Sequence, residues 1–151
     1  MMMNMENRAA NLTVALIEKD SIGIELGVWK GITNAKFAKR TKHLTLVDSW
    51  SVEPYHKSDE WKDFDSYLAR YARLLKIEPS IEAFTEKYEE IYQDVIEKFK
   101  DDDNVEILRM TTDKFFQSFN KPKVDWLYVD AEHSFEGIQR DLDNSFGILK
   151  E

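Results

Sequence analysis

Hydrophobic residues recur along this chain with two alternating periods. Ile22, Ile24 and Leu26 alternate with other residues as in a β-strand, and compact apolar runs at residues 43–50, 105–110 and 124–130 predict three more strands. Apolar residues at helical spacing predict helices between them. The predicted helices span residues 8–19, 32–39, 58–75, a segment after Pro79 that ends at Phe99, a short piece with Phe115, Phe116 and Phe119, and residues 135–149.

This order predicts the fold class. Strands that alternate with helices at this spacing form a parallel sheet with helices on both faces, which is the doubly wound α/β arrangement. The chain has 151 residues, of which 42% are hydrophobic, so it is long enough for one domain with a real core. We expect a single domain over residues 1–151, with about four strands and a helical insertion at about 52–78.

Candidate site residues follow from the ends of the strands. Ligands of doubly wound sheets bind at the carboxyl ends of the strands. The residues at these ends are Glu25 with Gly27 and Gly31, Asp48, Met110 with Thr111 and Thr112, and Asp130 with His133.

The acids among them argue against a phosphate ligand. The sequence E-x-G-x-x-x-G departs from the dinucleotide pattern G-x-G-x-x-G, and Gly31 precedes Ile32 rather than the lysine of a Walker loop. A ligand that is cationic near this loop and carries a ribose fits better. S-adenosylmethionine has a sulfonium and an amino group and no phosphate.

Asp48 supports the same ligand. It lies 23 residues after Glu25, close to the offset of about 20 residues at which a carboxylate accepts hydrogen bonds from ribose hydroxyls. Each residue alone has a simpler explanation. Asp48 is also suited to capping the following helix, and any tight turn between a strand and a helix favours glycine.

Charge and composition limit the kinds of binding partner and the cell compartment that we expect. The chain has 29 acidic and 21 basic residues and a net charge of −8, which disfavours a nucleic-acid partner. Cysteine is absent, which excludes disulfides and thiolate chemistry. The first residues lack the features of a signal peptide, and no apolar run has the length of a membrane span. We expect a cytoplasmic protein without a membrane partner.

Three stretches carry a family resemblance. IELGVWKG, LTLVDSW and above all VDWLYVDAEHSFEGIQRDL resemble class I S-adenosylmethionine-dependent methyltransferases, in particular the group with an Asp-Ala-x-His-Ser-Tyr-like turn after the fourth strand. The resemblance runs from about residue 20 to the C-terminus and implies a Rossmann-like fold. It implies that S-adenosylmethionine is the cofactor. Because the acidic composition disfavours RNA or DNA as the acceptor, we expect the methyl acceptor to be a small molecule or a sugar-like hydroxyl.

The resemblance also implies roles for the strand-end residues. Gly27 and Gly31 would pass close to the methionine part of the cofactor, Glu25 would reach its amino group, and Asp48 would hold its ribose. Met110, Thr111 and Thr112 would contact adenine, although Met110 stands where the family commonly has glycine.

Asp130 and His133 are the candidate catalytic residues. Asp130 would lie beneath the transferring methyl group, and His133 has three open roles: general base, ligand of a divalent metal together with Asp130, or a hydrogen bond within its own turn. Trp50 and Tyr55 are further candidates, as a lining for the acceptor pocket, although aromatic residues after a strand more often serve packing.

The chain supplies four of the family's roughly seven strands. We interpret it as the cofactor-binding half, either a truncated frame or a variant completed by another chain. The fourth strand would then have an open edge, and we expect a homodimer through strand 124–130 and helix 135–149.

Three functions are compatible with these observations. The first is a methyltransferase directed to oxygen, and the second is a binding or interaction module that keeps the fold without turnover. The third, least favoured by the acidic strand ends, is a NAD-dependent oxidoreductase on the same fold.

Overall fold

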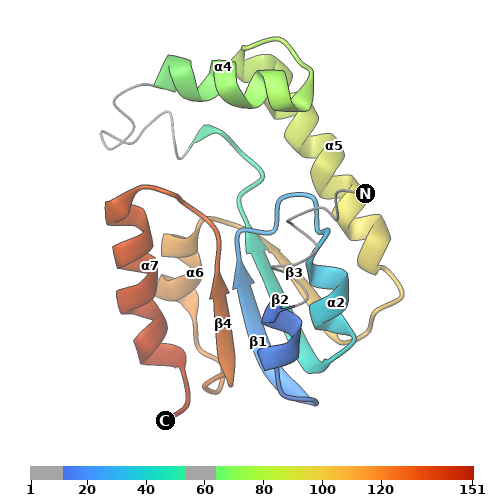
Figure 1. Cartoon of the computed structure of the whole chain (residues 1–151), viewed down its shortest axis with the longest axis vertical. Coiled ribbons are helices and arrows are strands. Elements are labelled where there is room, and N and C mark those ends of the chain that lie inside the picture. The colour runs from blue at the N-terminus through green and yellow to red at the C-terminus, as the bar shows by residue number, and fades with distance from the viewer. Residues whose placement is uncertain (1–11, 54–63) are drawn as a thin grey trace.

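The computed structural model describes residues 12–53 and 64–151, and its centre is a parallel sheet (Figure 1). Four strands lie in the order β3-β2-β1-β4, and every pairing is parallel. The strands are β1 (Ser21–Leu26), β2 (Thr41–Asp48), β3 (Val105–Arg109) and β4 (Trp126–Val129). Their carboxyl ends therefore meet at one edge of the sheet, as the strand pattern predicts.

The sheet has a hydrophobic core on each face. On one face, Leu44 and Leu46 of β2 pack with Phe37 of α2 (Asn34–Ala38) and with Val95 and Phe99, which belong to α5 (Ile81–Phe99). On the other face, apolar side chains of the strands pack against α6 (Thr112–Ser118) and the end of α7 (Phe135–Ile148); the buried members are Ile24, Leu26, Val47, Phe115 and Val124. Helices on both faces confirm the doubly wound α/β fold.

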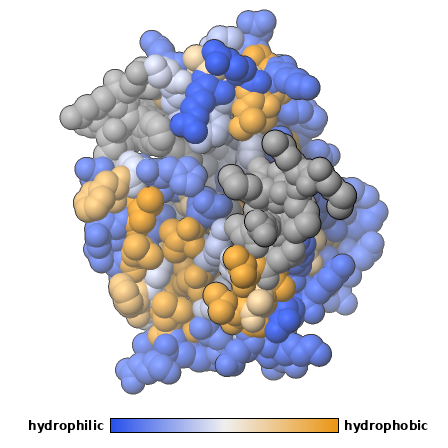
Figure 2. All heavy atoms as spheres, in the orientation of Figure 1, coloured by the Kyte–Doolittle hydropathy of each residue, from blue (hydrophilic) through white to orange (hydrophobic). Residues whose placement is uncertain are grey.

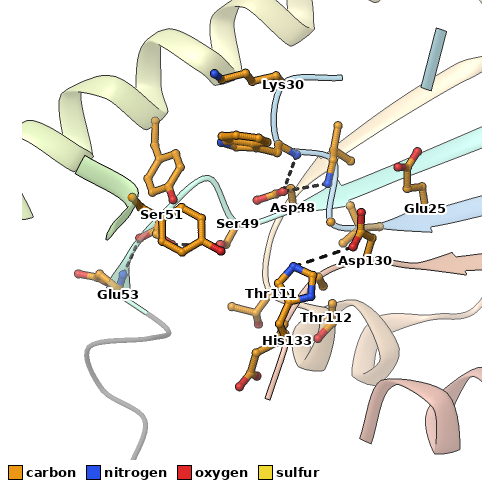
Figure 3. A pocket seen from close by; sticks show the side chains of 18 of the residues that line it. Glu25, Lys30, Asp48, Ser49, Ser51, Glu53, Thr111, Thr112, Asp130 and His133 are labelled. Carbon is orange, nitrogen blue, oxygen red and sulfur yellow. Dashed lines mark hydrogen bonds and ion pairs between the residues drawn. The ribbon is translucent and has the colours of Figure 1, made fainter. Parts of the chain in front are cut away.

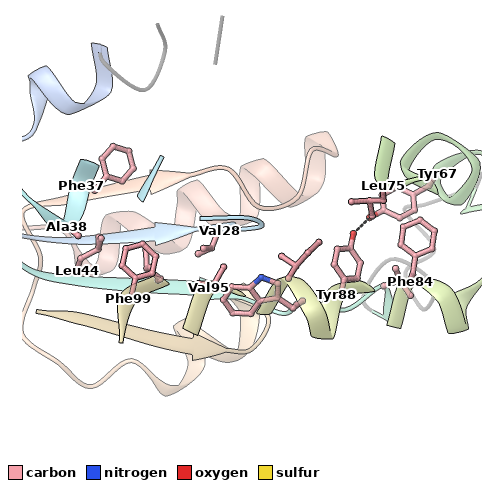
Figure 4. Packing of buried hydrophobic residues seen from close by; sticks show 14 of the residues in the cluster. Val28, Phe37, Ala38, Leu44, Tyr67, Leu75, Phe84, Tyr88, Val95 and Phe99 are labelled. Atoms are coloured by element: carbon pink, nitrogen blue, oxygen red, sulfur yellow. Dashed lines mark hydrogen bonds between the residues drawn. The ribbon is translucent and has the colours of Figure 1, made fainter. Parts of the chain in front are cut away.

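Helix α5 is longer than the sheet face that it covers. Its second half packs on the sheet, and its first half extends past the carboxyl edge to contact α4 (Phe64–Leu75), as Figure 4 shows. Phe84 is fully buried there, and the hydroxyls of Tyr67 and Tyr88 lie 3.4 Å apart. Helix α4 is thereby held above the ends of the strands (Figure 1).

Hydroxyl side chains fix where three helices begin. Ser80 accepts a hydrogen bond from the N–H of Ala83 at the start of α5, Thr111 serves α6, and Ser134 serves α7 in the same way. Such caps satisfy backbone donors that a helix leaves unpaired at its first turn. Ser58, the predicted start of the helix at 58–75, lies outside the described residues. Of the predicted helix at 8–19, residues 12–16 are helical, and Leu12 and Leu16 are exposed.

Helix α7 buries small and polar residues and exposes most of its apolar stripe. Its buried residues are Gly137, Asp141 and Ser145. The apolar residues at helical spacing point away from the core, with exposed fractions of 77% for Phe135, 38% for Ile138, 43% for Leu142 and 74% for Phe146. Figure 2 shows apolar side chains gathered on the face of the molecule that carries α7 and β4.

The outer edge of β4 is not open along its whole length. Beyond the end of α7, Leu149 forms a parallel bridge with Val124, and Val124 exchanges backbone hydrogen bonds with Ile148 and Lys150. The expectation of unpaired backbone groups beside Val124 is therefore wrong, because the end of the chain returns along this edge. This pairing removes part of the reason to expect a homodimer.

Candidate functional site

A cavity of about 1600 Å³ lies between the carboxyl edge of the sheet and α4. Its floor is formed by the strand ends and the loops that follow them, and α4 and Tyr88 of α5 contribute the opposite wall. Of the predicted site residues, the cavity is lined by Glu25, Gly27, Asp48, Met110, Thr111, Thr112, Asp130 and His133. The structure thus brings together residues from all four strand ends.

Gly27 is required by the close approach of two strand ends. Its φ is +90°, and a Cβ at this position would lie 2.1 Å from the carbonyl oxygen of Asp130. Only glycine fits, because L side chains avoid this backbone region and the neighbouring atoms belong to the backbone. The turn brings Asp130 next to the glycine loop.

Asp48 joins two loops at the cavity floor. One oxygen of its carboxylate accepts hydrogen bonds from the backbone N–H groups of Val28 and Trp29, both at 2.9 Å, and the other accepts from the N–H of Trp50 at 2.7 Å. Figure 3 shows the two bonds to the glycine loop. These bonds hold the loops after β1 and β2 together. Asp48 therefore does not serve as the cap of a following helix, the simpler explanation that the sequence offers.

Glu25 is a buried acid at the same edge. Its side chain is 3% exposed and accepts a hydrogen bond from the side-chain amide of Asn34, the first residue of α2. Burial raises the pKa of Glu25 well above its ordinary value, and the charges of Asp130 and Asp48 raise it further, while the Asn34 bond lowers it. Three carboxyl groups therefore converge on one part of the cavity, which favours a cationic ligand.

Asp130 and His133 lie on the loop that follows β4. Burial raises the pKa of Asp130, and His133 acts in the opposite direction. The imidazole Nε2 lies 3.9 Å from the Asp130 carboxylate (Figure 3), and both side chains are more than half exposed to the cavity or solvent.

These two residues do not make a metal centre by themselves. Within residues 12–53 and 64–151, no group of three or more His, Asp or Glu side chains is arranged to hold a metal ion.

Two predicted residues lie elsewhere. Gly31, with φ +62°, does not line the cavity, and a Cβ there would lie 3.4 Å from Val95 and from Phe99 of α5. Trp50 is 2% exposed, donates its indole N–H to the carbonyl of Trp29, and packs on Tyr92 at 4.9 Å. Neither residue lines the cavity: the positive φ favours glycine at position 31, and Trp50 packs in the core. Tyr55 lies outside the described residues.

The wall formed by α4 is the part of the site that the sequence does not reveal. Its cavity-lining residues include Ser66, Tyr67, Arg70, Tyr71 and Arg73. The predicted amphipathic pattern gives the buried stripe of this helix, but nothing in the pattern shows that the polar face covers a site. Lys98 of α5 adds a tie to the glycine loop, donating to the carbonyls of Lys30 and Gly31 at 2.8 and 3.0 Å.

Comparison with known proteins identifies a family. Residues 24–151 match the model of a family described as a methyltransferase domain. Among curated proteins, none matches the sequence. In the part of the chain that the structure describes, no helix is both long and apolar enough to cross a membrane.

Several solved structures share the fold. An rRNA methylase from Streptococcus thermophilus is 8% identical with a TM-score of 0.57, covering 99% of this chain and 68% of its own. Precorrin-6y C5,15-methyltransferase from Geobacter metallireducens is 12% identical with a TM-score of 0.58, covering 99% and 59%. Fibrillarin from Aeropyrum pernix, solved with S-adenosyl-L-methionine, is 15% identical with a TM-score of 0.55, covering 96% and 50%.

These similarities show the fold and correct one expectation. The chain spans 50% to 68% of the length of these three proteins. Because an rRNA methylase has this fold over 99% of the chain, the exclusion of nucleic acid as a partner is wrong. The net charge of −8 averages over the whole surface and does not describe the local charge around the cavity, where several bases lie.

Proposed function

This chain belongs to the methyltransferase domain family, of the class I type with a Rossmann-like fold, and we propose that it binds S-adenosylmethionine in the cavity and transfers the methyl group to an acceptor hydroxyl. The observation that carries this proposal is the convergence of Glu25, Asp48 and Asp130 on one cavity. Three acids at the strand ends suit a cation with a ribose and oppose a pyrophosphate.

The residues fit the cofactor in chemical type. The buried carboxyl of Glu25 would bind the amino group of the methionine part. Asp48 keeps acceptor capacity on one oxygen beside its three backbone bonds, enough for a ribose hydroxyl. Met110, Thr111 and Thr112 line the cavity next to the end of β3 and would contact adenine.

The chemistry needs position and a proton acceptor. The cofactor supplies a methyl group on a sulfonium, and the electron pair of the breaking C–S bond stays on sulfur while the acceptor oxygen forms the new C–O bond. Cavity walls that hold the acceptor oxygen close and in line supply most of the acceleration. Asp130 or His133 would take the hydroxyl proton, because both line the cavity on the same loop.

Calorimetric titration with S-adenosylhomocysteine and with NAD tests the cofactor. We expect S-adenosylhomocysteine to bind and Glu25→Gln to weaken it at least tenfold. Glu86→Gln is the matched control, because Glu86 is exposed on α5 and does not line the cavity. Binding of NAD without binding of S-adenosylhomocysteine would refute the methyltransferase proposal.

Turnover is tested separately. The protein is incubated with S-adenosylmethionine and two groups of acceptors, small phenolic or sugar hydroxyls and RNA, and methylated product is measured. Product that falls at least tenfold in Asp130→Asn supports transfer at this site. Cofactor binding without any product would favour the second function, a binding module without turnover.

A further inference from the structure

The underside of α4 carries two arginines over the cavity. Ser66, Ala69, Arg70 and Arg73 are spaced three and four residues apart, which places them on one face of the helix. All four line the cavity, whereas the buried face of α4, with Leu68, Ala72 and Leu75, packs away from it. Side chains at such spacing are neighbours, about 5 to 6 Å apart at Cβ.

These arginines differ from the other arginines at the cavity. Arg109 pairs with Glu89 at 2.6 Å, and Arg140 pairs with Asp113 at 3.0 Å and with Glu132 at 3.1 Å. Arg70 and Arg73 have no ion pair with any acid in residues 12–53 or 64–151; Arg70 only lies 5.8 Å from the ring of Tyr71. As far as the described residues are concerned, their guanidinium donors are therefore available to a ligand.

The cavity has room for a second molecule on this side. Sites for one small molecule typically measure about 300 to 1000 Å³, and this cavity measures about 1600 Å³. A cofactor held at the acidic floor by Glu25 and Asp48 would leave the space beneath α4 unfilled. An acceptor bound there would share the cavity with the cofactor.

Charge is separated across this space. The floor carries Glu25, Asp48 and Asp130, and the α4 wall carries the two arginines. A cationic cofactor suits the first and an anionic group suits the second. Two adjacent guanidinium groups match a phosphate, which carries up to two negative charges and accepts bidentate hydrogen bonds.

We propose that Arg70 and Arg73 bind a phosphate group of the methyl acceptor. That the phosphate belongs to a methyl acceptor rests on the proposed function, whereas the phosphate site itself does not. Leu74, 58% exposed, and the half-buried Tyr71 line the cavity beside the arginines. They supply an apolar surface for the part of the acceptor next to its phosphate. The phosphate belongs either to a small phosphorylated molecule or to RNA.

Binding of two probes tests this site. Phenyl phosphate and a short uridine oligoribonucleotide are titrated into the full chain with and without saturating S-adenosylhomocysteine. The variant is Arg70→Gln/Arg73→Gln. The control is Lys42→Gln/Lys123→Gln, which removes two charges from exposed residues that do not line the cavity. Circular dichroism checks that both variants are folded, as expected for exposed positions.

We expect the arginine variant to lose at least tenfold in affinity for a phosphate probe while the lysine control stays within twofold. A loss for phenyl phosphate assigns a small phosphorylated acceptor, and a loss for the oligoribonucleotide alone assigns RNA; both support the site. Equal affinities of the arginine variant and the control for both probes overturn it. S-adenosylhomocysteine affinity, measured in the same variants, should stay unchanged, so failure of the cofactor proposal is seen independently.

Discussion

Gly27 sets how closely the first and fourth strand ends approach. Because φ is +90° and a Cβ would lie 2.1 Å from the Asp130 carbonyl oxygen, we expect Gly27→Ala to lower the free energy of unfolding by more than about 2 kcal/mol. The sequence alone suggests instead that a side chain here fills the space of the ligand. Chemical denaturation distinguishes the two: a variant of normal stability that loses only ligand affinity contradicts the structural role.

Gly147 is the matched control for Gly27. It lies in α7, and a Cβ there would have no atom within 4 Å. Gly147→Ala should therefore leave stability unchanged or raise it by up to about 1 kcal/mol, since alanine favours the helix over glycine.

Glu25 makes cofactor binding depend on pH. Its pKa is raised by burial and by neighbouring acids, so the carboxyl is neutral below this raised pKa and charged above it. The ammonium group of S-adenosylhomocysteine prefers the charged form of Glu25, so affinity should rise as pH rises toward the raised pKa of the unliganded protein and level off above it. Glu25→Gln should flatten this rise in calorimetric titrations. An identical pH profile in the variant would remove Glu25 from the ligand site.

Residue types at strand ends could be predicted, but their partners could not. Eight of the nine predicted site residues line the cavity, because the rule for parallel sheets fixes where strand ends meet. Asp48 bonds to Val28 and Trp29, which depends on how two loops fold against each other. Gly31 faces α5 for the same kind of reason: its neighbours on that helix, Val95 and Phe99, lie more than 60 positions along the chain.

At the scale of elements, α7 shows that periodicity can predict a helix without showing which of its faces is buried. The prediction of a helix over 135–149 is confirmed by α7 (Phe135–Ile148). The buried stripe, however, consists of Gly137, Asp141 and Ser145, and a Cβ at Gly137 would lie 2.5 Å from the side chain of Glu132. A hydrophobic pattern shows that a face is suited to contact, without showing what contacts it.

Asp141 makes the packing of α7 sensitive to pH. It is 1% exposed, so its carboxylate is shielded from solvent. Burial raises its pKa, with Asp113 and Glu132 adding to the rise and Thr112 and Arg140 opposing it. The folded state therefore binds the proton more tightly than the unfolded state, so this residue lowers stability as pH rises from the ordinary value near 3.8 through the raised pKa.

Asp141→Asn should remove this loss. Relative to the original chain, the variant should gain free energy of unfolding as pH rises across that window, and the gain should be complete above the raised pKa. Denaturation at a series of pH values measures the difference. Asp143→Asn is the control, because Asp143 is an exposed residue of the same helix, two positions after Asp141. A pH-independent difference between Asp141→Asn and the original chain would contradict a buried charge.

At the scale of the molecule, the order of strands and helices determines the sheet, while α4 and the long α5 determine the cavity. The sequence pattern predicts both helices, but only their packing through Phe84, Tyr67 and Tyr88 holds α4 over the carboxyl edge. That placement depends on side-chain contacts beyond the sheet. It converts an open edge with acids into a cavity with an acidic floor and a basic wall.

Two phenylalanines test where side-chain packing stabilises the fold: at the contact between α4 and α5, or also at the exposed face of α7. Phe84 is fully buried between α5 and α4, and Phe146 on α7 is 74% exposed. Phe84→Ala should lower the free energy of unfolding by about 3 to 5 kcal/mol, as large core truncations do, whereas Phe146→Ala should change it by less than about 0.5 kcal/mol. Both are measured by denaturant unfolding of dilute protein. If Phe146→Ala lowered the free energy of unfolding nearly as much as Phe84→Ala, the apolar face of α7 would be covered in solution. The contact that covers it would then contribute to the stability of the fold.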